Sequence, residues 1–563
     1  MDFQQELAQA IAAAASLSPQ EARQALEVPP DSTMGDYAFP CFRLAKTWRK
    51  APQMIASELA EKIAVPDFVQ KVEVKGAYLN FFLDAGVFAR EVLEAVEQAG
   101  LQYGSSTEGA GKTIVIDYSS PNIAKPFHVG HLRSTVIGNA LYHIFQALGY
   151  HAIGINHLGD WGTQFGKLIV AYQKWGSKEA VEEKGITELM RLYVKFHEQA
   201  EQTPELEDEA RAWFKKMQDG DEEALTLWKW FYDISMKEFE RVYGMLHVTF
   251  DHYTGESFYN DKMDAVVQEL KDKGLLVESN GALIVDLSED NMPPCLILRS
   301  DGGTLYATRD ITAAIYRKKT YHFDKCIYLT ALDQNLHFAQ WFKVIEKMGY
   351  DWAKDLVHVP FGLVSLDSGK LSTRKGHVVL MEDLLHQSVE ETRKIIAEKN
   401  PDLPDKETVA RQVGIGAVIF NDLYNSRVKD VVFSWERMLN FEGETGPYVQ
   451  YTNARANSIL RKAGETAQPV DYRLLSDAAS FDVCKALAAF PEKVHEAAEK
   501  YEPSVVSRSL MDIAQKFNKF YHDNPILNQS DEIKYARLAV VRAVTVVLTR
   551  GLGLLGIEAP EQM

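Results

Sequence analysis

The sequence has few cysteines and lacks the patterns that mark secreted or membrane proteins. Its four cysteines, Cys41, Cys295, Cys326 and Cys484, are scattered, and no two have the close spacing of a zinc site or a redox motif. No apolar run reaches the roughly 18 residues that a membrane span needs, and the N-terminus lacks the basic and then apolar layout of a secretory signal. We therefore expect reduced, buried cysteines in a cytoplasmic protein that does not enter a membrane.

Positive charge is also in short supply. The chain has 61 Lys and Arg against 79 Asp and Glu, a formal net charge of −18. This balance argues at first against a nucleic-acid partner, because phosphate contacts need Lys and Arg. A negative total does not exclude basic patches on one face, and basic residues do cluster near positions 46–50, 317–319, 370–375 and 455–462. A nucleic-acid partner therefore stays possible.

What is present indicates a multidomain α/β protein. At 563 residues, with 46% hydrophobic and 25% charged residues, the chain is too long for one core. Residues 1–110 read as an α+β module that ends in a Gly/Ser-rich linker. Residues 111–400 alternate strands and helices, which predicts a doubly wound parallel sheet, with a helical insertion at about 175–290 that ends in a hairpin turning at Asn280–Gly281. Residues 401–563 show only helical spacing and predict an all-α bundle.

The most informative stretch is a turn from a strand into a helix. Thr113–Tyr118 is a β-branched apolar run, and apolar residues recur at helical spacing from Leu132 onward. Such a turn points backbone N–H groups at a bound anion. His128 and His131 share one face of the first helical turn, and Gly130 between them leaves the backbone open to a ligand. Two imidazoles could donate to phosphate oxygens while the α-phosphorus of a nucleotide is attacked, although a capped helix with two surface histidines fits equally well.

The longer stretch around the two histidines favours the nucleotide site over the capped helix. It resembles the HIGH motif of class I aminoacyl-tRNA synthetases, with flanks like those of the arginyl-tRNA synthetases, over Pro121, Asn122, Ile123, Ala124, Lys125, Pro126, Phe127, His128, Val129, Gly130 and His131. The run Gly159–Gly166 is similar to one in the same family. The resemblance covers essentially the whole chain, and it implies a Rossmann-like class I catalytic domain between an N-terminal module and a helical anticodon-binding domain.

A second motif follows a later strand. Gly369–Gly376 is short, basic and flanked by glycines, and it resembles the KMSKS loop of class I synthetases; a solvated loop is the alternative. The family's second lysine falls on Thr373 and its final serine on Arg374. In arginyl-tRNA synthetases this loss goes with an extra lysine just before the HIGH motif, where Lys125 stands. The resemblance implies catalytic roles for His128, His131, Lys125 and Lys370, and ATP binding by His128, Gly130, His131, Lys370, Ser372 and Lys375. Whether Lys125 or Lys375 replaces the missing lysine stays open.

The second half of the sheet provides groups suited to a guanidinium. Tyr306 and Asp310 are four residues apart and share a helix face, and Gln334 follows the strand Lys325–Thr330. A carboxylate accepts the planar fork of a guanidinium two bonds at a time, and a ring can stack on it. By pattern alone, Asp310 could equally be a helix cap or a surface acid. The resemblance implies that arginine is bound by Asp117, Ser120, Asn122, His131, Tyr306, Asp310 and Gln334.

Two further regions are implied to contact RNA. The family's N-terminal module packs on the tRNA elbow, which would let Tyr78 and Asn80 contact a D-loop base. Near the start of the helical bundle, the resemblance implies anticodon-side contacts from Tyr448, Gln450 and Arg455. In each case the alternative is that these side chains pack within their own domain.

The resemblance implies an arginine–tRNA ligase that makes arginyl-adenylate and passes arginine to a tRNA 2′-hydroxyl. The expected partners are tRNA(Arg), L-arginine and ATP, with Mg²⁺ accompanying the ATP and no fixed protein metal site. We expect a monomer in the cytoplasm. Members of this family generally need bound tRNA before they activate the amino acid. The alternatives are another class I synthetase, a nucleotidyltransferase of the same fold, or a non-catalytic RNA-binding relative.

Overall fold

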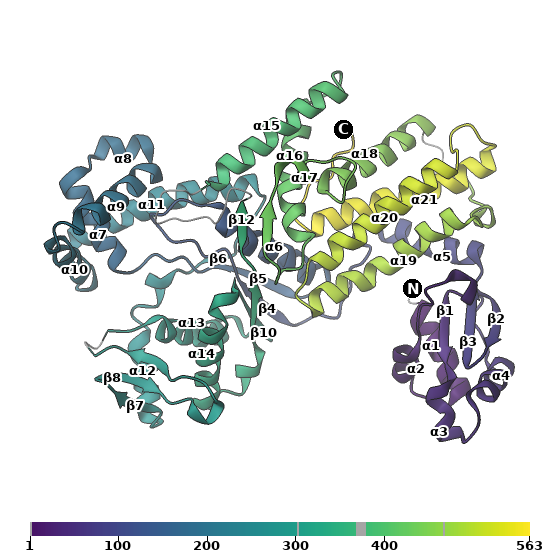
Figure 1. Cartoon of the computed structure of the whole chain (residues 1–563), viewed down its shortest axis with the longest axis horizontal. Coiled ribbons are helices and arrows are strands. Elements are labelled where there is room, and N and C mark those ends of the chain that lie inside the picture. The colour runs from purple at the N-terminus through teal and green to yellow at the C-terminus, as the bar shows by residue number, and fades with distance from the viewer. Residues whose placement is uncertain (1–2, 301–302, 367–378, 465–467) are drawn as a thin grey trace. The chain divides into compact units, whose positions relative to one another are not determined.

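The computed structural model describes residues 3–300, 303–366, 379–464 and 468–563. The chain forms two compact units (Figure 1). Unit 1 contains Met1–Tyr103, Thr452–Phe490 and Asp512–Arg550, and unit 2 contains Gly104–Tyr451, Pro491–Met511 and Gly551–Met563. All four cysteines are buried and free, as expected.

The N-terminal part of unit 1 is an α+β module. Its antiparallel sheet has the order β1-β3-β2, formed by β1 (Tyr37–Pro40), β2 (Val69–Lys75) and β3 (Tyr78–Leu83). The strands and helices agree with the predicted α+β character of this part of the chain. The surrounding helices are α1 (Phe3–Ala15), α2 (Pro19–Ala25), α3 (Ala45–Trp48), α4 (Pro52–Lys62) and α5 (Ala85–Ala99).

Helix α5 packs on C-terminal residues of the same unit. The rings of Phe88 and Phe481 lie 5.5 Å apart, and the Tyr103 hydroxyl donates to the Leu487 carbonyl at 3.1 Å. These contacts explain why the N-terminal residues group with parts of the C-terminal helices. Those helices are α18 (Gly446–Ala463), α19 (Ala478–Glu499), α20 (Ser504–Asp523) and α21 (Asp531–Leu554). The three-segment division at 110 and 400 stays a prediction.

Unit 2 contains the predicted doubly wound sheet. Its order is β11-β10-β4-β5-β6, and all four neighbouring pairs are parallel. The strands are β4 (Thr113–Asp117), β5 (His151–Asn156), β6 (His252–Tyr253), β10 (Lys325–Ala331) and β11 (Leu356–Phe361). Helices α6 (Leu132–Ala147), α12 (Met263–Asp272), α13 (Tyr306–Tyr321) and α14 (Asn335–Lys347) connect or cover them. Val115, Cys326 and Trp341 are fully buried in the core between the sheet and helices α12, α13 and α14. The parallel sheet and its helices confirm the predicted fold class.

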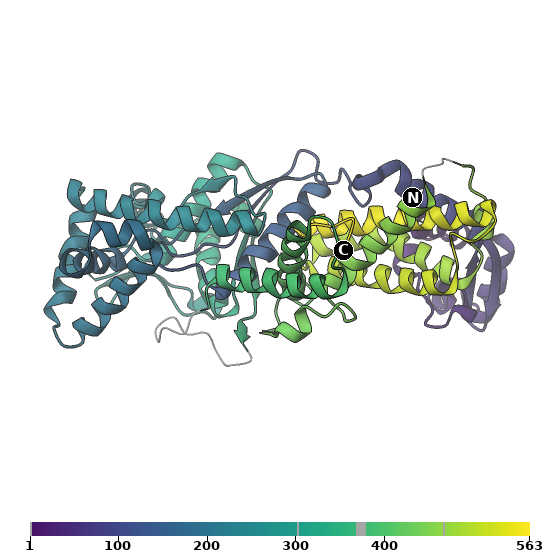
Figure 2. The same cartoon turned by 90° about the horizontal axis from the view of Figure 1, so that it is seen from above.

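The insertion begins after β5. It contains α7 (Thr163–Trp175), α8 (Lys178–Lys184), α9 (Ile186–Ala200), α10 (Glu205–Gln218) and α11 (Glu222–Met245), seen as the blue group of helices in Figure 2. The chain then returns to the sheet at β6, and the bounds of about 175–290 for the insertion stay a prediction. A separate antiparallel sheet follows, with β7 (Leu276–Ser279), β8 (Ala282–Val285) and β9 (Cys295–Leu298). The predicted turn is confirmed, because Asn280 and Gly281 both have positive φ, 51° and 77°.

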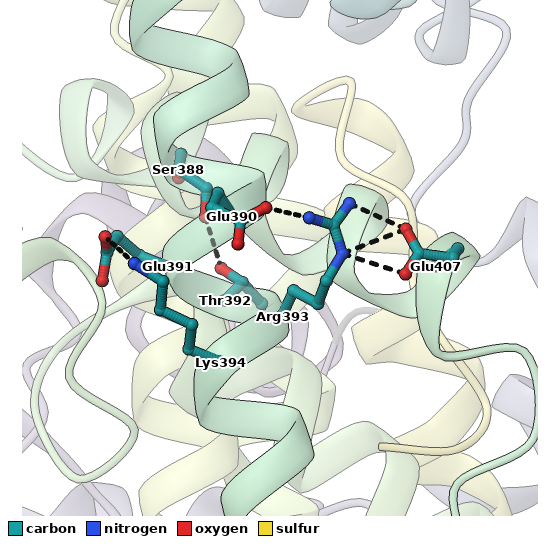
Figure 3. Close-up of polar contacts among 7 residues, drawn as sticks. All are labelled: Ser388, Glu390, Glu391, Thr392, Arg393, Lys394 and Glu407. Atoms are coloured by element: carbon teal, nitrogen blue, oxygen red, sulfur yellow. Dashed lines mark hydrogen bonds and ion pairs between the residues drawn. The ribbon is translucent and has the colours of Figure 1, made fainter.

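Helices α15 (Met381–Lys399) and α16 (Lys406–Leu423) form a tightly packed pair. A Cβ on Gly414 would lie 2.8 Å from the Val389 Cα, so only glycine permits this approach. On the surface of the pair, Arg393 donates from Nε and a terminal nitrogen to Glu407 at 2.9 and 2.7 Å and also bonds to Glu390 (Figure 3). Within α15, Thr392 bonds to the Ser388 carbonyl at 2.8 Å. This pair is relevant to the site because α15 begins beside the histidine motif.

The prediction of only helices beyond residue 400 is wrong at one place. Strand β13 (Val431–Phe433) pairs in parallel with β12 (Val364–Leu366) and precedes α17 (Trp435–Met438). A three-residue strand is too short to show alternation in the sequence. Its partner β12 lies well before it in the chain, so local pattern could not reveal the pairing.

Candidate active site

The order of the strands reverses between β4 and β10, the place at which an open α/β sheet forms its ligand-binding crevice. These two strands are neighbours in the sheet. From β4 the chain continues to β5, toward one edge of the sheet, and from β10 it continues to β11, toward the other edge. Ligands of open α/β sheets bind at such a reversal, outside the carboxyl ends of the strands. The loop from Tyr118 to His131 leaves β4 there, and Leu332–Gln334 leaves β10. The predicted catalytic and arginine-binding residues therefore arise from one edge of the sheet.

The loop after β4 is held in a strained backbone conformation. Ser119, Ser120 and Ala124 have φ values of 71°, 49° and 61°, a region that costs non-glycine residues about 1–3 kcal/mol each. Buried hydroxyls hold this loop: the Ser119 N–H donates to Ser134 Oγ at 2.8 Å and the Ala124 N–H to Ser235 Oγ at 2.9 Å. Strain that the surrounding structure enforces is typical of functional sites.

The same loop pairs with the loop after β5. The Gly159 N–H donates to the Pro121 carbonyl and the Ile123 N–H to the Gly159 carbonyl, both at 3.1 Å. A Cβ at Gly159 would lie 2.1 Å from Asn122 Oδ1, so a side chain there would displace Asn122. Asn122 itself is exposed at this edge. Glycine at position 159 thus keeps Asn122 in place.

Backbone bonds fix the tautomer of both motif histidines. The Gly130 N–H donates to His128 Nδ1 at 3.0 Å, and the His128 N–H donates to His131 Nδ1 at 3.2 Å. A ring that accepts at Nδ1 carries its proton on Nε2 when it is neutral. The two rings lie 4.0 Å apart, and His131 stacks on Phe127 at 5.0 Å. Each ring therefore has an Nε2–H available as a donor.

The surroundings keep both rings neutral. Burial lowers the pKa of His128, and Lys125 nearby lowers it further. Burial, the neighbouring His128 and Lys125 together lower the pKa of His131 to about 3. At pH 7 both imidazoles are uncharged donors beside a lysine cation. This arrangement suits an anion such as a triphosphate.

Helix α6, which begins at the histidines, is anchored by a buried ion pair. Arg133 Nε lies 2.9 Å from Asp422 Oδ1 of α16, and the two side chains are 1% and 2% exposed. Arg133 also donates to the carbonyls of Gly362 at 3.2 Å and Lys429 at 2.5 Å. These contacts join α6 to α16 and to the backbone beyond β11, so they position the histidine motif.

The second motif falls largely outside the described residues. Lys370, Ser372, Thr373, Arg374 and Lys375 lie in 367–378, so the structure gives no account of their predicted roles. The chain that follows is fixed to the histidine motif. The Val129 N–H donates to the Val379 carbonyl at 3.1 Å, and the Met381 N–H donates to the Phe127 carbonyl at 2.9 Å.

The predicted guanidinium-binding residues come from the first turns of two helices. Tyr306 and Asp310 lie in the first turns of α13, and Gln334 immediately precedes α14. Both helices run back against the strands, so their N-termini lie at the carboxyl edge of the sheet. The Tyr306 ring is 69% exposed and free to cover a ligand. Asp310 Oδ2 accepts a bond from His337 Nε2 at 2.6 Å.

Asp117 is already paired within the protein. Its Oδ2 lies 2.8 Å from a terminal nitrogen of the buried Arg317, and its Oδ1 accepts from Ser120 Oγ at 3.0 Å. Asp117 was predicted to bind arginine, and its pairing with Arg317 has no signal in the sequence. Arg317 compensates the negative charge of Asp117. A further contact of Asp117 is its hydrogen bond to Ser120, which orients the Ser120 hydroxyl.

The sequence analysis missed Glu256, which lies near Asp310. Glu256 belongs to a short 3₁₀ turn, Glu256–Tyr259, and its Oε1 lies 3.6 Å from Arg309 of α13. Burial raises the pKa of Glu256 to about 7, Arg309 opposes this rise, and the negative charges of Asp160 and Asp310 add to it. Asp310 and Glu256 thus place two carboxyl groups close together, beside Tyr306 and Gln334. We call this set of four residues the acidic slot. No sequence motif marks Glu256, because the turn is too short to show a period.

The residues predicted to bind RNA fall into two groups. Tyr78 is 36% exposed, and its ring lies 6.1 Å from Phe42, which is also exposed. Tyr448 and Arg455 are partly exposed on α18. The other two are buried, Asn80 to 3% exposure within its sheet and Gln450 completely, and their contacts with RNA stay predictions. Gln450 Nε2 donates to the Gln412 and Glu558 carbonyls at 3.1 and 2.8 Å, so contact with RNA would require those bonds to break.

Across the described ranges, no helix combines the length and apolarity required to span a bilayer. In the same part of the chain, no three His, Cys, Asp or Glu side chains are grouped as a metal site.

Comparison with known proteins gives consistent matches along the chain. Family models match residues 1–83 (arginyl tRNA synthetase N terminal domain), 92–435 (tRNA synthetases class I (R), catalytic domain) and 449–563 (DALR anticodon binding domain). The arginine–tRNA ligase of Alkaliphilus metalliredigens is 58% identical over 100% of both chains. That of Clostridioides difficile is 57% identical over 97% of both. The solved Thermus thermophilus arginyl-tRNA synthetase has a TM-score of 0.84 at 27% identity and covers 99% of each chain. The chain belongs to the arginyl-tRNA synthetase family of class I aminoacyl-tRNA synthetases.

Proposed function

We propose that the crevice between β4 and β10 activates L-arginine with ATP and that the chain then transfers arginine to tRNA(Arg). Family membership assigns the ATP-dependent arginine–tRNA ligase reaction to the chain. The observation that carries the assignment to this crevice is the pair of neutral histidines in the loop after β4, at the same sheet edge as Asp310 of α13 and Glu256 of the turn Glu256–Tyr259.

In the first step the arginine carboxylate attacks the α-phosphorus of ATP, and pyrophosphate leaves. Negative charge builds on the phosphate oxygens, where the Nε2–H groups of His128 and His131 donate. Lys125 and Lys370 neutralise phosphate charge, with Ser372 and Lys375 as further contacts. Gly130 allows the nucleotide to approach the backbone. We place Mg²⁺ on the ATP phosphates, where it would share the charge neutralisation with the lysines.

Arginine lies with its guanidinium in the acidic slot. Asp310 and Glu256 accept its N–H groups, Tyr306 covers its plane, and Gln334 closes the end. Ser120 and Asn122 hold the α-amino and carboxylate end, beside His131. This orientation directs the carboxylate toward the histidines. Positioning and charge stabilisation then account for most of the rate enhancement.

In the second step the 2′-hydroxyl of the terminal adenosine of the tRNA attacks the adenylate carbonyl, and AMP leaves. We propose that Tyr78 stacks on a base at the tRNA elbow and that Tyr448 and Arg455 contact the RNA on the anticodon side. The protein acts as a monomer in the cytoplasm. Arginine activation requires bound tRNA, as in the family generally.

The test is a charging assay with total tRNA and each radiolabelled amino acid in turn. Wild-type protein should charge tRNA with arginine alone, and Asp310→Asn should lose most of that activity at low arginine concentration. Charging by another amino acid would favour a different class I synthetase. No charging at all would favour a non-catalytic RNA-binding relative.

A further inference from the structure

His337 contacts the carboxylate proposed to recognise the substrate guanidinium. It lies in the first turn of α14, three residues after Gln334, and its Nε2 is 2.6 Å from Asp310 Oδ2 of α13. An ionised carboxylate can only accept, so the imidazole donates from Nε2. At 25% and 28% side-chain exposure, Asp310 and His337 are both partly shielded from water, which strengthens a bond of this kind.

This bond restricts the free rotation of the carboxylate. The terminal torsion of an aspartate has a broad energy well, so an isolated carboxylate turns easily about its last bond. A guanidinium is planar and requires a carboxylate whose plane and oxygens are aligned with it. With Oδ2 held by His337, Oδ1 and the remaining lone pair of Oδ2 keep a fixed direction.

Among the described residues, the two nearest candidates do not substitute for His337. Arg309, the next residue to Asp310, is directed to Glu256 at 3.6 Å. His358 of β11 bonds through Nε2 to Thr330 Oγ1 at 2.8 Å and stacks on Phe338 at 4.3 Å. Both side chains have other partners, so His337 is the group that bonds to Asp310 across the two helices.

We propose that His337 is a positioning residue for arginine: its imidazole holds the Asp310 carboxylate in the orientation that receives the guanidinium. The inference rests on the proposed function and extends it to a residue that does not itself bind the substrate. A residue that binds a ligand needs supporting hydrogen bonds from its neighbours to hold it in the binding orientation. The alternative is competition, in which His337 occupies Asp310 and must be displaced by arginine.

Three variants separate these readings in the charging assay. His337→Ala removes the donor, and we expect the KM for arginine to rise about tenfold, the effect of one hydrogen bond of about 1.4 kcal/mol, while the KM for ATP stays within about twofold. His337→Gln places an amide nitrogen near the position of Nε2 and should restore most of the affinity. His337→Asn, the matched control, places its nitrogen near the position of Nδ1 and should not.

A double-mutant comparison links the effect to Asp310. In an Asp310→Asn background, His337→Ala should add less than about twofold to the KM for arginine, because coupled residues are not additive. An unchanged or lower arginine KM in His337→Ala would overturn the proposal, as would equal recovery by Gln and Asn. Equal rises in the ATP and arginine KM values would also overturn it. Loss of the proposed function would look different, since the wild-type protein itself would then fail to charge arginine.

Discussion

Glu256 should make arginine binding depend on pH near neutrality. Its side chain is 14% exposed, and burial together with Asp160 and Asp310 raises its pKa to about 7 despite the opposing charge of Arg309. The positively charged guanidinium favours the ionised form of Glu256. Arginine affinity should therefore rise as the pH increases through 7, and binding at lower pH should release a proton.

The size of the effect follows from the titration. With a pKa near 7, the ionised fraction of Glu256 rises from about a tenth at pH 6 to about nine tenths at pH 8. If only the ionised form binds the guanidinium, the KM for arginine should fall about tenfold over that range. In Glu256→Gln, whose side chain stays neutral, the KM should lie above the wild-type value even at pH 6 and should change less than about twofold with pH.

The assay measures tRNA charging against arginine concentration at pH 6, 7 and 8, with ATP and tRNA saturating. The KM for ATP, measured in parallel, serves as the control for general effects of pH on the protein. A pH-independent arginine KM in the wild type would refute the reasoning. So would a pH dependence that persists unchanged in Glu256→Gln, because the titrating group would then lie elsewhere.

The remaining predictions concern the histidines, the guanidinium slot and the buried ion pair. His128→Ala should slow adenylate formation about a hundredfold, the typical effect of one preorganised donor, and a loss under threefold in a single-turnover assay would argue against this role. Asp310→Asn should raise the arginine KM far more than the ATP KM in steady-state charging, and equal effects would remove Asp310 from the slot. Asp422→Asn should destabilise unit 2 by about 3–5 kcal/mol, because it leaves the Arg133 charge buried without its partner. Adding Arg133→Met to that variant should recover part of the lost thermal stability, and no recovery would mean that the buried charge is not the cause.

Local pattern was sufficient to predict the parts of the fold that depend on neighbouring residues. The run Thr113–Tyr118 predicted β4, because a strand buried on both faces is a continuous apolar run. The spacing after Leu132 predicted α6, because a helix repeats its apolar residues every three or four positions. The hairpin at Asn280–Gly281 followed from residues that tolerate positive φ. The family motif then identified which side chains at those turns carry chemistry.

Contacts between distant segments could not be predicted in this way. Glu256 lies near Asp310, and Arg317 pairs with Asp117, only because α13 folds back against the sheet that contains β4 and β6. The burial of Gln450 depends on carbonyl partners at Gln412 and Glu558, which lie far from it in the chain. A mix of aromatic and polar residues on α18 therefore suggested an RNA surface without showing which side chains face inward.

The most direct test of the account is a crystal structure with L-arginine, tRNA and a non-hydrolysable ATP analogue bound. The account predicts an α-phosphate oxygen within hydrogen-bond distance of His128 Nε2 or His131 Nε2. It also predicts the guanidinium between Asp310 and Glu256, with the arginine carboxylate directed at the α-phosphorus. A nucleotide bound away from the two histidines, or a guanidinium outside the acidic slot, would contradict it.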